Sequence, residues 1–242
     1  MVRLDRALVA AGLAESRARA QALIAAGAVR VDGVPAAKAS AMVGPEAALT
    51  VEGDPLPWVS RAGAKLAHAL AVFGLDPRGA VALDLGASTG GFTQVLLEAG
   101  AAEVWAVDVG HGQLAPALAA DARVRAIEGL NARALTPAHV PPPDWIVADL
   151  SFVSLLKALP PALALAKPGA VLVALVKPQF EVGRAAVGKG GIVRDAAAVS
   201  AARARVRSFL EGAGWTVTGE AESPIRGGDG NVEYLVAATG PR

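Results

Sequence analysis

The sequence contains no cysteine among its 242 residues. Disulfide bonds, zinc–thiolate sites and cysteine nucleophiles are therefore excluded. Long apolar runs are also missing, because the longest, residues 170–176, is far shorter than the ~20 residues of a membrane-spanning helix. Three of the first six residues are charged, where a secretion signal would need an apolar block. These absences predict a cytoplasmic globular protein.

Aromatic residues make up only 4% of the chain, although 53% of it is hydrophobic. The difference is alanine, which occurs 56 times and accounts for a mean hydropathy of +0.43. The positive hydropathy thus reflects small side chains and does not indicate a membrane protein. The length is typical of one large domain or two unequal ones.

The near-neutral net charge of +1 hides an uneven distribution. Residues 1–40 hold six basic and three acidic side chains, residues 78–150 hold four and eight, and residues 151–242 hold eleven and seven. Basic ends around an acidic middle are typical of a protein whose ends contact a polyanion. Ordinary solvated surface explains the same distribution equally well on charge alone.

The chain divides into two regions with different patterns. Residues 1–53 predict two short helices, the second capped by Ser16, and then strands at 29–31 and 49–51. Asp32-Gly33 is a hairpin-turn signal after the first of these strands. Gly53 and the two prolines that follow it indicate a linker, expected at residues 54–59, and residues 60–242 form the expected second domain.

The second region alternates between helical patterns and apolar strands. Such strands are typical of a parallel sheet covered on both faces, which makes α/β the expected fold class. A helix is expected from about residue 195 to 211. The expected strands are 81–85, 103–107, 124–127, 145–148, 170–176, 215–220 and 232–238.

A glycine-rich loop follows the first of these strands and predicts a nucleoside cofactor. Its glycines follow the spacing G-x-x-x-G-G, with Asp84 two residues before the first of them. Asp108 ends the next strand and can accept hydrogen bonds from both ribose hydroxyls. A dinucleotide site would show G-x-G-x-x-G, so the spacing favours S-adenosylmethionine (SAM) over a nicotinamide cofactor. A β–α turn without a ligand is the alternative.

Four charged residues occupy otherwise apolar elements: Lys65, Asp149, Lys177 and Glu233. Asp149 and Lys177 directly follow apolar strands, Glu233 interrupts the terminal strand, and Lys65 lies on a helix. A charge rarely survives at such places unless it is paired or functional. Each alone is more simply a partnered structural charge, but together they predict a reactive site at the carboxyl edge of the sheet.

Several motifs in order along the chain resemble the hemolysin-A-type (TlyA) ribosomal RNA 2′-O-methyltransferases. These motifs are 60–66, 84–92, 108–110, 149–152, 176–181 and 230–234. The resemblance implies a Rossmann-like SAM methyltransferase sheet, mostly parallel with an antiparallel last strand, and a small N-terminal α/β RNA-binding domain. It also implies that the Lys-Asp-Lys-Glu catalytic tetrad of FtsJ-type ribose methyltransferases falls on Lys65, Asp149, Lys177 and Glu233.

The resemblance implies a substrate and a cofactor set as well. The expected reaction methylates a ribose 2′-hydroxyl of ribosomal RNA, at a cytidine of the large subunit and in some members also of the small subunit. His111 stands where the family has an aromatic residue, and the chain ends soon after its last expected strand, which favours the large subunit. The residues assigned to SAM are Asp84, Gly86, Ser88, Thr89, Gly90, Gly91, Phe92, Asp108, Asn131 and Asp149.

Residues 1–57 separately resemble an RNA-binding module found in a small-subunit ribosomal protein and in pseudouridine synthases. Phosphate contacts to ribosomal RNA or a ribosomal subunit are expected, and no membrane partner. The three histidines lack metal-ligand spacing, so no metal is expected. The assigned RNA-binding residues are Arg3, Arg6, Arg17, Arg19, Lys38, Arg61 and Lys189.

Methyl transfer needs the ribose hydroxyl to lose its proton, and Lys177 is the residue expected to polarise or deprotonate it. A lysine is normally protonated, but burial and a second lysine nearby favour its neutral form. Asp149 would hold Lys177, while Lys65 and Glu233 would position the ribose. The rival hypotheses are an RNA-binding ribosome-assembly factor with an inactive methyltransferase fold, a membrane-active haemolysin and a nicotinamide oxidoreductase.

Overall fold

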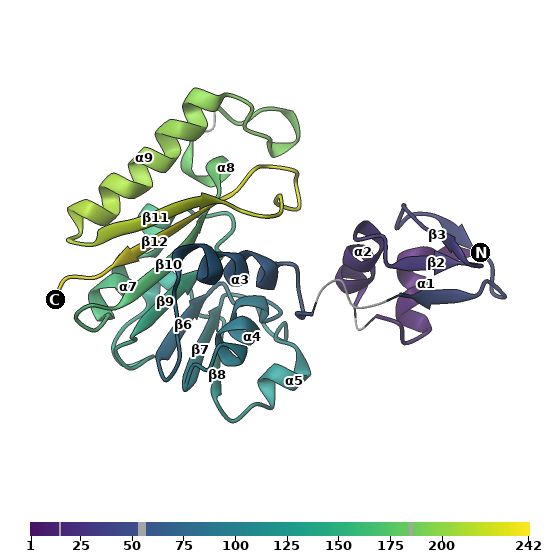
Figure 1. The fold of residues 1–242 in the computed structure, drawn as a ribbon, viewed down its shortest axis with the longest axis horizontal. Coiled ribbons are helices and arrows are strands. Elements are labelled where there is room, and N and C mark those ends of the chain that lie inside the picture. The colour runs from purple at the N-terminus through teal and green to yellow at the C-terminus, as the bar shows by residue number, and fades with distance from the viewer. Residues whose placement is uncertain (15, 53–56, 184–185) are drawn as a thin grey trace. The chain divides into compact units, whose positions relative to one another are not determined.

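The chain folds into two compact units, Met1–Arg61 and Ala62–Arg242, in a computed structural model (Figure 1). The structure describes residues 1–14, 16–52, 57–183 and 186–242. Half of the expected linker, residues 54–56, therefore lies outside the described residues.

The N-terminal unit packs two helices against short strands. Helix α1 (Leu4–Ala10) is followed by α2 (Arg17–Ala25), whose first turn is capped as expected, with the Ser16 hydroxyl accepting a hydrogen bond from the Arg19 backbone N–H at 3.2 Å. Asp32 and Gly33 both have positive φ, which is the geometry of a tight hairpin turn. The core of this unit includes Leu4, Leu8, Leu23, Ile24 and Val29.

The strands of the N-terminal unit form two small sheets. The expected hairpin forms from β2 (Val29–Val31) and β3 (Val34–Pro35), and β5 (Leu49–Val51) pairs with β2 on its other side. A second pair, β1 (Val2–Arg3) and β4 (Met42–Val43), was not expected from the sequence. Two residues per strand are too few to produce a recognisable alternation.

The C-terminal unit is built on a single seven-stranded sheet. Its strands are β6 (Val81–Leu85), β7 (Glu103–Asp108), β8 (Val124–Glu128), β9 (Trp145–Ala148), β10 (Val171–Val176), β11 (Thr216–Glu222) and β12 (Tyr234–Thr239). The strand order is β11-β12-β10-β9-β6-β7-β8. Only β12 runs against the others in this sheet, so the expected mostly parallel sheet with an antiparallel last strand is confirmed.

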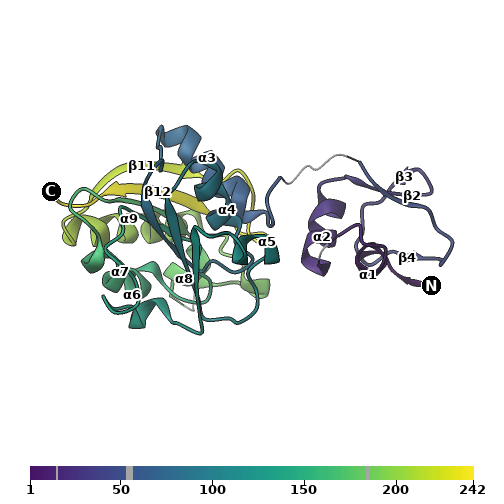
Figure 2. The same ribbon diagram turned by 90° about the horizontal axis from the view of Figure 1, so that it is seen from below.

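Helices cover both faces of this sheet, which explains why the central strands β9 and β10 are apolar throughout (Figure 2). One face carries α3 (Ala62–Phe73), α4 (Gly91–Glu98) and α5 (Pro116–Ala119); the other carries α6 (Leu155–Ala158), α7 (Pro160–Leu165) and α9 (Ala196–Gly212). The short helices η1 (Ala132–Ala134), α8 (Pro178–Glu181) and η3 (Lys189–Gly191) lie in the connections. Leu172 is fully buried, and burying such a side chain contributes about 1.5–3 kcal/mol.

The reversed direction of β12 brings distant parts of the sequence to one edge of the sheet. Tyr234, the first residue of β12, pairs with Val176, the last residue of β10. Glu233 therefore lies beside Lys177, immediately before the strand. The expectation that Glu233 interrupts a strand was wrong, because β10 cannot extend the ladder once Pro178 begins α8.

Candidate active site

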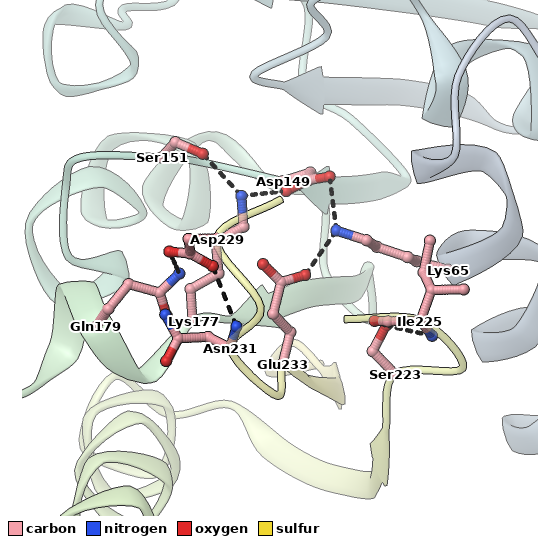
Figure 3. Close-up of polar contacts among 10 residues, drawn as sticks. All are labelled: Lys65, Asp149, Ser151, Lys177, Gln179, Ser223, Ile225, Asp229, Asn231 and Glu233. Carbon is pink, nitrogen blue, oxygen red and sulfur yellow. Dashed lines mark hydrogen bonds and ion pairs between the residues drawn. The ribbon is translucent and has the colours of Figure 1, made fainter. Parts of the chain in front are cut away.

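Four charged side chains meet at the carboxyl edge of the sheet (Figure 3). Asp149 follows β9, Lys177 follows β10, Glu233 precedes β12, and Lys65 reaches the group from α3. The Lys177 Nζ is 2.7 Å from Asp149 Oδ1, and the Lys65 Nζ is 3.8 Å from Asp149 Oδ2. The Lys65 Nζ also donates to Glu233 Oε2 at 2.6 Å. Asp149 thus lies between two lysines, and one of them continues the network to Glu233.

This group, which we call the tetrad, is almost fully enclosed by protein. Lys65, Lys177 and Glu233 are 7%, 8% and 2% exposed. Breaking one partner of a buried ion pair leaves an uncompensated charge, so the two cations and two anions depend on each other. Convergence from four separate elements is the arrangement that the sequence predicted, and the catalytic roles of the four residues remain a prediction.

Ser151 joins the tetrad through Lys177. The Lys177 Nζ donates a hydrogen bond to the Ser151 Oγ at 2.8 Å (Figure 3). Sequence reasoning included Ser151 in a motif but gave it no role. A hydroxyl two residues after a candidate catalytic aspartate was the available signal.

A pocket of about 500 Å3 adjoins the tetrad at the ends of β6, β7 and β9. At the end of β7, the Asp108 carboxylate accepts hydrogen bonds from the Ser88 N–H at 2.8 Å and the Gly110 N–H at 2.7 Å. Pockets of this size hold drug-sized ligands. The assigned cofactor residues that line it are Gly86, Ser88, Asp108, Asn131 and Asp149.

Gly86 shows why the cofactor loop needs glycine. Its φ is +81°, and an added Cβ would lie 2.7 Å from the backbone oxygen of Asp149. Both facts exclude a larger residue, because only glycine adopts this backbone region without strain and only a missing side chain permits the approach. The close approach keeps the ends of β6 and β9 together below the pocket.

The remaining assigned cofactor residues do not line this pocket. Asp84, Gly91 and Phe92 are buried, and Thr89 is half-buried. Gly90 has a φ of +97°, and an added Cβ would lie 2.3 Å from the Leu118 side chain. These residues pack inside the protein next to the loop. A role for any of them in cofactor binding remains a prediction.

Asp84 gives the folded protein a specific pH dependence. Burial raises the pKa of Asp84 to about 7, with the nearby Asp149 charge adding to the effect and the hydrogen bond from the Thr93 hydroxyl opposing it. The folded state therefore keeps a proton that the unfolded state releases above a pKa of about 3.8. Stability then falls as the pH rises through this window and levels off above about pH 7.

Replacing Asp84 with asparagine is expected to remove this slope. Between about pH 5 and about pH 8, wild type should lose about 3 kcal/mol of unfolding free energy relative to Asp84→Asn. Asparagine keeps a side-chain oxygen that can accept from Thr93, so the comparison isolates the charge. Urea denaturation of both proteins without cofactor measures the difference. Parallel pH curves for the two proteins would contradict a proton held at Asp84.

A second pocket, of about 430 Å3, lies on the other side of the tetrad. Lys65, Lys177 and Glu233 line it, together with Phe180, Gln179 and Asp229. We call it the acceptor pocket and the first one the cofactor pocket. Asp149 lines the cofactor pocket, so the tetrad lies between the two.

Ser151 and Phe152 line both pockets. Phe152 is 92% exposed and has a φ of +64°, which is unusual for a bulky residue. Its ring lies 5.3 Å from that of Phe180, centroid to centroid. Sequence reasoning placed Phe152 and Gln179 in motifs and Asp229 in a turn, but it gave none of them a role. Exposed aromatic surface at a pocket mouth can be recognised only once the fold is known.

Two basic side chains of the N-terminal unit form ion pairs with the same acidic side chain. Arg3 and Arg17 both donate to the carboxylate of Asp5, which is fully buried. The hydrogen bond from Arg3 is the largest of several contacts that hold the pKa of Asp5 far below its usual range. Arg19 donates to the backbone oxygen of Trp58 at 2.8 Å.

The other assigned RNA-binding residues are less constrained. Arg6, Lys38 and Arg61 are exposed. The side chain of Lys189 lies outside the part of the chain that the structure describes. RNA binding by any of the seven assigned residues remains a prediction.

Comparison with known proteins accounts for both units. Residues 58–239 match the family described as FtsJ-like methyltransferase, and residues 2–49 match the S4 domain. A solved structure from Streptococcus thermophilus, described as a candidate hemolysin, is 39% identical with a TM-score of 0.80. The alignment covers 99% of this chain and 88% of that one.

Curated relatives match along nearly the whole length. The 16S/23S rRNA (cytidine-2′-O)-methyltransferase TlyA of Mycobacterium tuberculosis is 48% identical over 97% of this chain and 88% of its own length. A protein named Hemolysin A from Brachyspira hyodysenteriae is 39% identical over 97% of this chain and 98% of its own length. The chain therefore belongs to the FtsJ-like methyltransferase family, as a TlyA-type member with an N-terminal S4 domain.

Proposed function

We propose that the protein transfers a methyl group from SAM to the ribose 2′-hydroxyl of a cytidine in ribosomal RNA. The observation that carries the proposal is the tetrad, which lies between a cofactor pocket and an acceptor pocket (Figure 3). The name of the Mycobacterium tuberculosis relative supports cytidine as the target nucleoside and either ribosomal subunit as its source. Ribosomal RNA as substrate supports action in the cytoplasm.

The cofactor pocket has the chemistry that SAM requires. Asp108 lies where it can accept hydrogen bonds from the two ribose hydroxyls of a nucleoside. Asp149 adds a second carboxylate to the pocket lining. Negative groups suit a ligand that carries a sulfonium and an ammonium. When bound, SAM supplies an electrophilic methyl group whose departure leaves a neutral thioether, S-adenosylhomocysteine.

On the acceptor side, Lys177 is the residue placed to take the proton of the 2′-hydroxyl. Lys65 contacts two carboxylates, whereas Lys177 contacts one carboxylate and one hydroxyl. Lys177 is therefore the amine with fewer negative partners. As the new oxygen–carbon bond forms, the O–H bond breaks and its proton moves to Lys177 Nζ, from which solvent removes it. Holding the 2′-hydroxyl oxygen in line with the methyl carbon and the sulfur supplies much of the remaining rate acceleration.

The other residues hold the acceptor nucleoside. The Lys65–Glu233 pair lies at the pocket wall and can hydrogen-bond a ribose. The exposed ring of Phe152 offers a stacking face for a base, a contact worth about 1–3 kcal/mol in single-stranded nucleic acids. Exposed basic residues of the S4 domain supply phosphate contacts that fix position more than sequence.

Two rival functions have less support. An assembly factor without activity would not require four converging charges, three of them buried, between two pockets. The Hemolysin A name belongs to a relative. Among the described residues, no helix is long and apolar enough to cross a bilayer.

The proposal is tested by methyl transfer to ribosomes. Ribosomal subunits from a strain that lacks this protein should accept labelled methyl from SAM when the purified protein is added. Mapping of blocked 2′-hydroxyls should locate the label at a cytidine. Absence of label on either subunit, with SAM binding intact, would favour the assembly-factor alternative. Leakage from liposomes treated with the pure protein would favour the haemolysin.

A further inference from the structure

The geometry around Lys177 points to Ser151 as a positioning residue for methyl transfer. We propose that the Ser151 hydroxyl fixes the rotation of the Lys177 amine, so that the nitrogen lone pair faces the acceptor pocket. This inference rests on the proposed function, and it assigns a role to a side chain outside the tetrad.

A lysine nitrogen has three positions besides its bond to Cε. One is used by a hydrogen bond in this structure, from Lys177 Nζ to Ser151 Oγ at 2.8 Å. Asp149 Oδ1 lies 2.7 Å from the same nitrogen as an ion pair, at angles that do not make a hydrogen bond. Lys177 also lines the acceptor pocket, where another position is available to a substrate. In the neutral amine, an N–H group held by Ser151 restricts rotation about the Cε–Nζ bond, and the position that faces the acceptor pocket stays open to the lone pair. Without Ser151 the amine could rotate about its Cε–Nζ bond.

The loop that carries Ser151 is held at both ends. At its start, the Asp149 N–H donates to the backbone oxygen of Leu85 at 3.1 Å. At its end, the buried Glu181 carboxylate accepts from the Ser154 hydroxyl at 2.6 Å and from the Leu155 N–H at 2.8 Å. Glu181 lies in α8, which begins directly after Lys177. One short helix therefore fixes both the lysine and the loop that presents its hydroxyl partner.

The backbone between these two ends is in an unusual conformation. Phe152, the residue after Ser151, has a positive φ of 64°. Such conformations are unfavourable for a bulky residue and persist only where the surroundings impose them. The backbone that carries Ser151 is thus constrained by the surrounding fold.

Charged groups from several segments of the C-terminal unit lie around Lys177. Asp149 contacts it directly, Lys65 and Glu233 follow in the same network, and Asp229 lines the same pocket. Ser151 is the neutral hydrogen-bond partner among these contacts. Its loss therefore changes the orientation of the amine while leaving the charge of the site unchanged.

The test compares Ser151→Ala, Ser151→Thr and the control Ser208→Ala, a serine exposed on α9. Each protein is assayed with SAM and ribosomal subunits from the strain lacking it. Ser151→Ala should lower kcat about 10- to 100-fold, the scale expected for a misplaced catalytic group. KM for the subunit and the Kd for SAM should stay within about twofold of wild type. Ser151→Thr, which restores a hydroxyl, should recover most of kcat.

Three results would overturn the inference. The first is a wild-type kcat in Ser151→Ala. The second is a loss confined to KM for the subunit, which would indicate direct RNA contact by the hydroxyl. The third is a Ser151→Thr variant as slow as Ser151→Ala although its unfolding temperature matches wild type. A wild-type protein that transfers no methyl group would instead refute the proposed function itself.

Discussion

Lys177→Ala is expected to reduce methyl transfer at least about 10³-fold while SAM still binds with wild-type affinity. Removing a general base costs about 10²–10⁴-fold, and Lys177 is also the nearer of the two lysines that contact Asp149. SAM binding should be spared because Lys177 lines the acceptor pocket and is not among the residues that line the cofactor pocket. Label transfer to ribosomal subunits measures the rate, and calorimetry measures the Kd for SAM.

Two further variants make the Lys177 experiment discriminating. Lys177→Arg keeps a cation beside Asp149, but arginine does not lose its proton in proteins, so this variant should be as inactive as alanine. Lys167→Ala is the matched control, because Lys167 precedes β10 while Lys177 follows it, and its partner Asp144 lies at the opposite edge of the sheet. A Lys177→Arg enzyme with a wild-type rate would mean that Lys177 acts only through its charge.

The fold of the C-terminal unit was predictable because its central strands, such as β9 and β10, are continuous apolar runs that end in a charge. The expected strand at 145–148 matches β9, and the expected helix at 195–211 differs from α9 by one residue at each end. Pairing partners were harder to infer, since they depend on distant segments. The β1–β4 pair, with two residues in each strand, has no periodicity to detect.

The candidate site was predictable in its members but not in its connections. A charge directly after an apolar strand identified Asp149 and Lys177, because parallel strands present such residues at one edge. Nothing in the sequence indicated that Lys65 would pair with Glu233, which is 168 positions away. Glycine spacing also could not separate Gly86, which lines the cofactor pocket, from Gly90, which packs against Leu118. The two glycines differ in which atoms lie nearest to an added Cβ, and those neighbours are known only from the fold.

Asp149→Asn is expected to impair both catalysis and SAM binding, unlike any change at Lys177. Asp149 lies between the two lysines and also lines the cofactor pocket. Asparagine removes the negative charge near the expected sulfonium and leaves two buried lysines with Glu233 as the remaining carboxylate of the tetrad. We expect kcat to fall by about 10²–10³-fold and the Kd for SAM to rise by about tenfold or more.

The control for Asp149 is provided by the same strand. Asp144 precedes β9 and Asp149 follows it, and each pairs with a lysine, but the Asp144–Lys167 pair is exposed. Asp144→Asn should therefore lower stability slightly and leave kcat and SAM affinity at wild-type values. If Asp149→Asn lowered kcat with an unchanged Kd for SAM, Asp149 would serve Lys177 alone. If it raised Kd with an unchanged kcat, the tetrad would belong to the cofactor pocket, and the lysines would have no part in activating the ribose hydroxyl.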